Sequence, residues 1–229
     1  MSTRGISVIA ALGLALVITL ILAFPVQAQE KGVSVKASTL GLGADFSFRL
    51  LPEFGLRLGV NYFPKTKVYD STISNAKYDV YLNLFTAGMY ADYYPVKEHP
   101  GFRLTAGLFY NDNHATFEAS LNPNQTYTIG GTSYSGAQLG RLKGKVKYNE
   151  IAPYLGAGYQ FAVSSDRRFS LGFDVGVLYM GRARVTMEAQ NPLNLPIQND
   201  LQREESRIKS NANRFEFYPV LSVGATYSF

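Results

Sequence analysis

The chain has 229 residues, a formal net charge of +5, 46% hydrophobic and 14% aromatic residues, and no cysteine. This length allows one or two folded domains, while the missing cysteine excludes disulfides, thiolate metal sites and a cysteine nucleophile. The positive charge is not gathered in a basic helix or in a dense Lys/Arg cluster with interleaved aromatics, so no nucleic-acid partner is expected.

Residues 1–28 differ in composition from the rest of the chain. Arg4 precedes an apolar run over residues 6–24, and Pro25-Val26-Gln27-Ala28 follows it. This pattern predicts a secretory signal peptide that is cleaved before Gln29. The alternative is an uncleaved anchor, because the run approaches the about 20 residues that span a bilayer. Pro25 and the cleavage site favour removal.

Residues 29–229 are expected to form one domain without a membrane helix, because no second long apolar run occurs. Apolar and polar residues alternate instead, which predicts strands. In residues 40–50 one face carries Leu40, Leu42, Ala44, Phe46, Phe48 and Leu50, and in residues 56–63 it carries Leu56, Leu58, Val60 and Tyr62. The short connection over residues 51–54 predicts an antiparallel hairpin.

The same unit recurs at residues 78–95 with 102–111, and at residues 151–161 with 169–179. Within residues 78–95 the apolar phase changes from even to odd positions, which predicts a bulge near Phe85 and Thr86.

A separate first strand is expected over residues 32–38. The apolar phase flips between Ala37 and Leu40, which indicates a turn between two strands. A single bulged strand is the alternative.

Short turns alternate with long polar connections at residues 68–77, 120–144 and 190–214. Outer-membrane barrels distribute periplasmic turns and extracellular loops in this way. Inside the loops, residues 126–134 predict a small hairpin around Gly130 and Gly131, and residues 199–210 predict a short charged helix with Asp200 as its cap.

The last segment, residues 215–229, is a strand with an apolar and a polar face. A strand that ends on Phe229, with Tyr227 two residues earlier, resembles the closing strand of bacterial outer-membrane β-barrels. The alternative is an edge strand of a soluble sheet. Nearly the whole mature chain resembles the OmpA/OmpX/OmpW class of small barrels.

This resemblance implies an all-β fold, a transmembrane antiparallel up-and-down β-barrel of eight strands, in the outer membrane of a Gram-negative bacterium. It also implies that Tyr227 and Phe229 form the signal that the barrel-assembly machinery reads. Outer-membrane lipid and lipopolysaccharide are the other expected partners.

So few strands leave an interior just wide enough to be filled by side chains. The polar faces at membrane depth carry four cations and four carboxylates: Lys36, Arg49, Arg57 and Arg103 with Asp45, Asp92, Asp174 and Glu216. A balanced set predicts an interlocked lumen charge network rather than a one-signed pore lining. A structural or surface-interaction role is therefore expected. A narrow conduit for small or apolar solutes, as in OmpW-type members, is the alternative.

An enzyme that modifies lipid A is the least favoured reading. Of the two histidines, only His114 lies at the outer end of a strand, whereas His99 falls in a periplasmic-type turn. A deacylase of the PagL type would need a histidine and a serine near the end of the chain, and the final strand contains no histidine. No catalytic residue, cofactor or metal site is expected.

Three lysines are candidates for lipopolysaccharide contact. Lys143, Lys145 and Lys147 share the odd phase of Ile151, so they are expected on the lipid face just above the apolar belt, where lipid A phosphates lie. The alternative is that they only solvate the margin of a loop.

Overall fold

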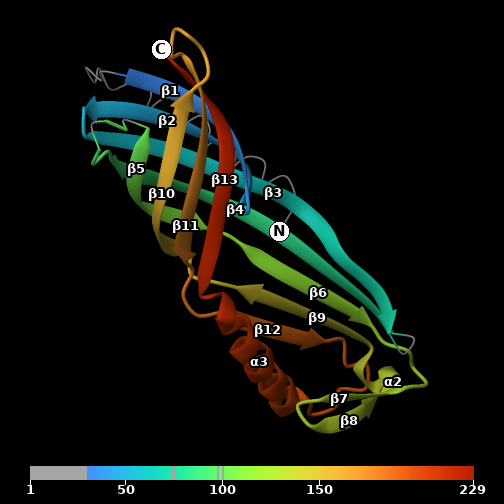
Figure 1. The fold of residues 1–229 in the computed structure, drawn as a ribbon. Coiled ribbons are helices and arrows are strands. Elements are labelled where there is room, and N and C mark those ends of the chain that lie inside the picture. The colour runs from blue at the N-terminus through green and yellow to red at the C-terminus, as the bar shows by residue number, and fades with distance from the viewer. Residues whose placement is uncertain (1–29, 74–75, 97, 100) are drawn as a thin grey trace.

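The computed structural model describes residues 30–73, 76–96, 98, 99 and 101–229. The predicted signal peptide lies outside these residues. A β-barrel occupies one end of the molecule, and part of its sheet continues beyond the barrel (Figure 1). No helix in the described ranges is both long and apolar enough to cross a membrane.

Eight antiparallel strands close the barrel. The ring consists of β1 (Glu30–Ser38), β2 (Gly41–Leu51), β3 (Phe54–Ile73), β4 (Ala76–Tyr93), β5 (Phe102–Asn111), β10 (Ile151–Ala162), β11 (Phe169–Tyr179) and β13 (Phe217–Ser228). It closes because β13 pairs with both β11 and β1, and because β4 also pairs with β5. The predicted all-β barrel is confirmed, and residues 32–38 belong to a strand of their own.

The outer surface of the barrel is apolar because the odd positions of β1, β10, β11 and β13 and the even positions of β2 and β5 point outward. Aromatic pairs lie at both ends of this belt. Phe169 packs on Tyr227 at one end, with ring centroids 5.0 Å apart, and Tyr179 packs on Phe217 at the other, at 5.1 Å. Aromatic girdles of this kind flank the lipid-facing band of outer-membrane barrels.

Five strands build the sheet that extends beyond the barrel. They are the far parts of β3 and β4 together with β6 (His114–Ser120), β9 (Arg141–Lys147) and β12 (Arg184–Ala189). Residues 68–77 were expected to be a polar connection, and that prediction is wrong, because β3 continues to Ile73 and β4 starts at Ala76. Outside lipid a strand needs no apolar outer face, so its sequence is as polar as that of a loop.

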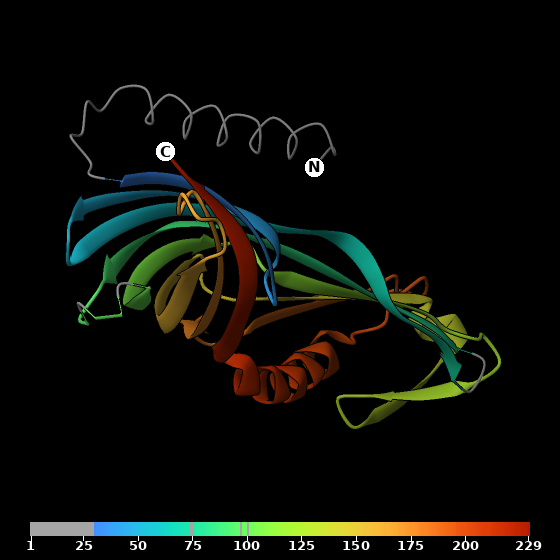
Figure 2. The ribbon, with the colours of Figure 1, turned by 45° about the horizontal axis from the view of Figure 1, so that its top comes forward.

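The extended sheet has a hydrophobic core of its own. Helix α3 (Gln198–Ala212) lies along one face of the sheet (Figure 2), and the hairpin β7 (Thr126–Ile129) and β8 (Thr132–Ser135) and the short helix α2 (Gly136–Leu139) complete this part. The buried cluster consists of Ala119, Ile129, Leu139, Leu142, Met187, Ile197 and Leu201. A helical turn, η1 (Asn213–Phe215), leads from α3 into β13.

The predicted hairpin at residues 126–134 and the predicted helix at residues 199–210 are confirmed. The predicted cap is wrong. Ile197 occupies the position before the helix, and Asp200 lies in the first turn, where its carboxylate accepts a hydrogen bond from the Tyr134 hydroxyl at 2.5 Å.

The predicted bulge near Phe85 and Thr86 is also wrong. The pairing of β4 with β5 and β6 shows no register shift there, and the two irregularities lie on β3, at Phe63/Thr66 and Lys67/Tyr69. Leu84 and Thr86 are both buried, so the even positions of β4 stay inside across the predicted bulge. The apolar residues of β4 move from even to odd positions although the strand itself is regular. Above the bilayer the inner face packs as a core and the outer face is wet, whereas within the bilayer the outer face is apolar.

Candidate functional site

The barrel interior holds a network of six charged side chains, each placed there by strand alternation. Three short ion pairs form its frame: Lys36 Nζ to Asp45 Oδ1 at 2.7 Å, Arg57 Nε to Asp92 Oδ2 at 2.6 Å, and Arg103 Nη2 to Asp174 Oδ1 at 2.7 Å. These residues come from β1, β2, β3, β4, β5 and β11, so the network ties together six strands of the ring.

Arg57 joins the three pairs into one network. Its guanidinium lies 3.6 Å from Asp45 and 3.7 Å from Asp174, in addition to its bidentate contact with Asp92. The Thr105 hydroxyl donates to Asp92 at 2.6 Å. Three cations therefore balance three carboxylates in a buried setting, where paired and hydrogen-bonded charges are tolerated and unpaired ones are costly.

Arg49 and Glu216 were predicted to belong to this network, and both lie outside it. Arg49 sits at the mouth of the barrel next to the turn between β2 and β3. There it donates to the Pro52 carbonyl at 2.8 Å, stacks on the Tyr94 ring at 3.9 Å and lies 3.8 Å from Glu30.

Glu216 lies on the outer side, next to the Tyr179 hydroxyl. Its backbone is still helical, with φ −55° and ψ −37°, because β13 starts one residue later. The alternation of a strand therefore does not apply to Glu216.

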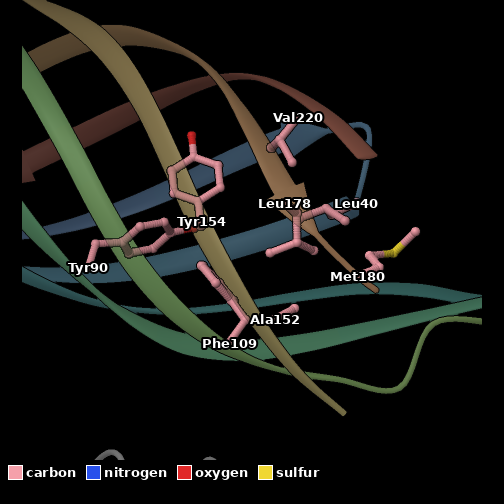
Figure 3. Packing of buried hydrophobic residues seen from close by; sticks show 8 residues of the cluster. All are labelled: Leu40, Tyr90, Phe109, Ala152, Tyr154, Leu178, Met180 and Val220. Atoms are coloured by element: carbon pink, nitrogen blue, oxygen red, sulfur yellow. The ribbon is translucent and has the colours of Figure 1, made fainter. Parts of the chain in front are cut away.

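An apolar cluster lies next to the charge network inside the barrel. Tyr90, Phe109 and Tyr154 pack edge to face, with ring centroids 4.8, 5.5 and 5.9 Å apart (Figure 3). The rest of the cluster is Leu40, Ala152, Leu178, Met180 and Val220. The two layers touch, because Arg57 stacks on the Tyr90 ring at 4.5 Å.

Little space remains between these layers. The cavity bounded by Lys36, Arg57, Tyr90, Tyr154 and Asp174, among others, measures about 10 Å³, which is room for roughly one water molecule. Glycine on the inner face does not open the lumen further, since a Cβ on Gly59 would overlap the Asp45 carboxylate and one on Gly176 would overlap the Tyr154 hydroxyl. These glycines make room for the packed side chains.

The three candidate lysines lie on β9, beyond the barrel. The pairing of β9 with β6, and of β6 with β4, places them on the face that continues the lipid-facing side of the barrel. They are not equivalent, because Lys143 lies 3.5 Å from Glu118, whereas Lys145 and Lys147 line a cavity.

This wall cavity measures about 330 Å³, and its lining includes Lys145, Lys147, Arg184, Asn111, Asp112 and Glu150. Arg184 was not among the residues that the sequence singled out. Only the pairing of β12 with β9, which sets Arg184 opposite Lys147, brings it to the lysines.

His114 is next to this cavity but has no arrangement for catalysis. Burial lowers the pKa of its imidazole, and its Nδ1 lies 3.0 Å from the Asp112 carbonyl oxygen. Among the residues that the structure describes, no group of three or more His, Asp or Glu side chains is placed to hold a metal ion.

The two aromatic residues of the predicted assembly signal lie where β13 closes the ring. The ring of Tyr227 contacts Phe169 of β11 and also Phe229, whose ring centroid is 6.2 Å away. The Phe229 amide donates to the Lys31 carbonyl at 2.9 Å.

Solved structures with the same fold come from *Acinetobacter baumannii*. CarO2 shares 25% identity at a TM-score of 0.59, covering 89% of this chain and 100% of its own, and CarO shares 21% at 0.56, covering 86% and 97%. No protein-family model matches the chain, and no curated protein matches it. The chain is a small eight-stranded β-barrel of the Gram-negative outer-membrane type.

Proposed function

We propose that this outer-membrane barrel has a structural or surface-interaction role and that side chains close its lumen. The observation that carries the proposal is the layered interior, in which six paired charges lie against an apolar cluster and leave a cavity of about 10 Å³. A solute path through the barrel would have to separate these pairs. Removing one partner of a buried pair costs about 3–5 kcal/mol, so an open state is strongly disfavoured.

The part beyond the barrel supports the surface-interaction role. The sheet strands β6, β9 and β12, together with β7, α2 and α3, form a second hydrophobic core outside the apolar belt. A chain needs no such core to close a barrel. The folded platform on the outer side is therefore suited to binding molecules at the cell surface. We propose no catalytic role, since His114 has only Asp112 as a polar partner in the described structure.

Liposome swelling with uncharged solutes of increasing size tests the closed lumen. Liposomes that contain the inserted protein should swell no faster than protein-free liposomes for every solute. Size-dependent swelling would contradict the proposal and favour the alternative, a narrow conduit for small or apolar solutes.

We also propose that Lys143, Lys145 and Lys147 contact lipopolysaccharide. They project from the face that continues the lipid-facing wall, and cations at this level attract phosphate groups, with a strength that salt reduces. Replacing all three by Gln should reduce the lipopolysaccharide that co-purifies with the barrel. Unchanged co-purification would contradict this contact.

A further inference from the structure

The wall cavity lies where strand pairing is interrupted. Tyr110 pairs with Ile151 below the interruption and His114 pairs with Lys147 above it, so residues 111–113 face residues 148–150 without regular pairing. The cavity of about 330 Å³ opens at this point. Sites for small ligands measure roughly 300–1,000 Å³, so this cavity can hold a small ligand or the headgroup of a lipid.

The cavity lacks negative charge opposite two of its cations. Within the described ranges, Lys145 forms no ion pair with a carboxylate. The Arg184 guanidinium donates a hydrogen bond to the Asn149 side-chain oxygen, at 3.4 Å. Asp112 is 3.9 Å from Lys147 and 3.6 Å from the His114 ring. Burial, and secondly the neighbouring Lys147, lower the pKa of Lys145. A bound anion would offset both effects.

The same cavity contains an acceptor without a donor. Asn111 is 2% exposed, its Nδ2 donates to the Asn149 carbonyl at 2.8 Å, and its Oδ1 has no hydrogen-bond partner among the described residues. A buried carbonyl oxygen without a partner costs about 1–3 kcal/mol. The Glu150 carboxylate lines the cavity as well. A ligand that fits therefore carries hydrogen-bond donors beside its negative charge.

The height of the cavity is that of the lipid headgroups. Tyr110 and Ile151, the last pair below it, are exposed on the apolar belt. The next regular pair, His114 with Lys147, is four residues further along both strands, which is about 13 Å at 3.3 Å per residue. The cavity thus lies directly above the hydrocarbon layer.

We propose that this wall cavity binds a phosphorylated sugar. The phosphate lies against Lys145, Lys147 and Arg184, while sugar hydroxyls donate to the Glu150 carboxylate. The proposal rests on the lipopolysaccharide contact proposed above and narrows it to one site. The sugar phosphate can belong to lipid A or to a soluble compound, and the experiment separates these sources.

Binding of purified lipopolysaccharide to the detergent-solubilised barrel tests the site. Arg184→Gln and Lys145→Gln should each weaken binding about tenfold, because one charge-assisted hydrogen bond is worth about 1.5–3 kcal/mol. Arg168→Gln is the matched control, since Arg168 lies in the turn between β10 and β11, at the other end of the barrel, and pairs with Asp166; it should change affinity by less than about twofold. Arg184→Lys, which keeps the charge, should retain most of the affinity, and all variants should keep the heat-modifiable migration of the folded barrel.

Binding measurements with other ligands identify the source of the sugar phosphate. Wild type and Arg184→Gln should bind enzymatically dephosphorylated lipopolysaccharide with the same affinity. Glucose 6-phosphate that binds the wild type but not Arg184→Gln, without displacing lipopolysaccharide, would assign the site to a soluble sugar phosphate. If the free amino acid glycine binds as tightly as the sugar phosphate, the proposal is wrong, because a zwitterion would then satisfy the site.

The site and the broader contact can fail separately. If the triple lysine variant loses lipopolysaccharide while Arg184→Gln binds like wild type, the cavity is not the site and the broader contact stands. If neither variant differs from wild type, both proposals are wrong.

Discussion

Asp92 is the most constrained carboxylate of the lumen. It is 1% exposed, accepts two hydrogen bonds from Arg57 and receives another from Thr105. Arg57 is only 8% exposed, so the two side chains depend largely on each other for their solvation. Removal of either charge would leave the other buried without its shortest ion pair.

Asp92→Asn should therefore lower the free energy of unfolding by about 3–5 kcal/mol, because it removes the closest partner of Arg57 and leaves three buried cations with two carboxylates. Urea unfolding of the barrel in lipid vesicles measures this change. The control is Glu118→Gln, which removes a surface partner of Lys143 and should cost about 0–1 kcal/mol. Equal effects of the two substitutions would show that burial does not decide the strength of the pairs.

Phe229 and Tyr227 are proposed to direct assembly, and their contacts at the seam between β13, β1 and β11 agree with that role. Deletion of Phe229 should reduce the amount of membrane-inserted, heat-modifiable protein in cells. Val223→Ala, an outward change in the middle of β13, serves as the control. Normal insertion of the deletion variant would contradict a role in assembly.

At the scale of elements, α3 holds the extended sheet together. Leu201 is buried in the cluster beneath the sheet, and the Glu205 carboxylate accepts a hydrogen bond from the Met187 amide of β12 at 2.6 Å. The helix therefore covers the edge strand of the sheet both by packing and by hydrogen bonding, which protects that edge from pairing with another chain.

Leu201→Ala should loosen α3 without opening the barrel. A buried Leu→Ala change costs about 2–5 kcal/mol, and this loss falls on the core of the extended sheet alone. Trypsin should cut the variant faster at Arg203, Arg207 or Lys209, while heat-modifiable migration stays normal. Gln202→Ala, on the exposed side of the same helix, should leave the cleavage rate unchanged. Equal cleavage of both variants would show that α3 does not depend on this core.

The barrel strands could be predicted because lipid requires an apolar outer face and alternation reports it directly. The strands beyond the bilayer could not be predicted in the same way. In β4 the residues Val80, Leu82 and Leu84 point to the inside like Thr86 and Tyr90, and only the surroundings of the strand change. A periodicity analysis cannot distinguish that change of surroundings from a bulge.

The candidate site, like the fold, could be predicted only where strand alternation decides the position of a side chain. Alternation placed six charges in the lumen but failed for Glu216, which precedes its strand. It found the lysines of β9 but neither the Glu118 partner of Lys143 nor Arg184. Those neighbours depend on cross-strand register over long sequence separations, and no local pattern contains that register.

At the scale of the whole molecule, one continuous sheet serves two environments. The ring of eight strands presents an apolar belt and a filled interior. Two of its strands, β3 and β4, continue with β6, β9 and β12 into a water-exposed platform supported by α3. The charge network links six strands of the ring, so under the proposed closed lumen it both stabilises the barrel and fills it.

Loss of one lumen charge should therefore change stability and permeability together. Asp174→Asn and Arg103→Gln each break the pair whose atoms lie 2.7 Å apart, and each should lower stability and raise conductance above that of wild type. Lys143→Gln, outside the lumen, should leave conductance at the wild-type level. Variants of the pair that lose stability without any gain in conductance would separate the two roles of the network.

Single-channel recording of the wild-type protein in planar bilayers tests the closed lumen most directly. The filled interior predicts no steady conductance, with at most brief and rare openings, at neutral pH and moderate voltage. A large, steady, ion-selective conductance of the wild-type protein would contradict the closed barrel and establish the conduit in its place.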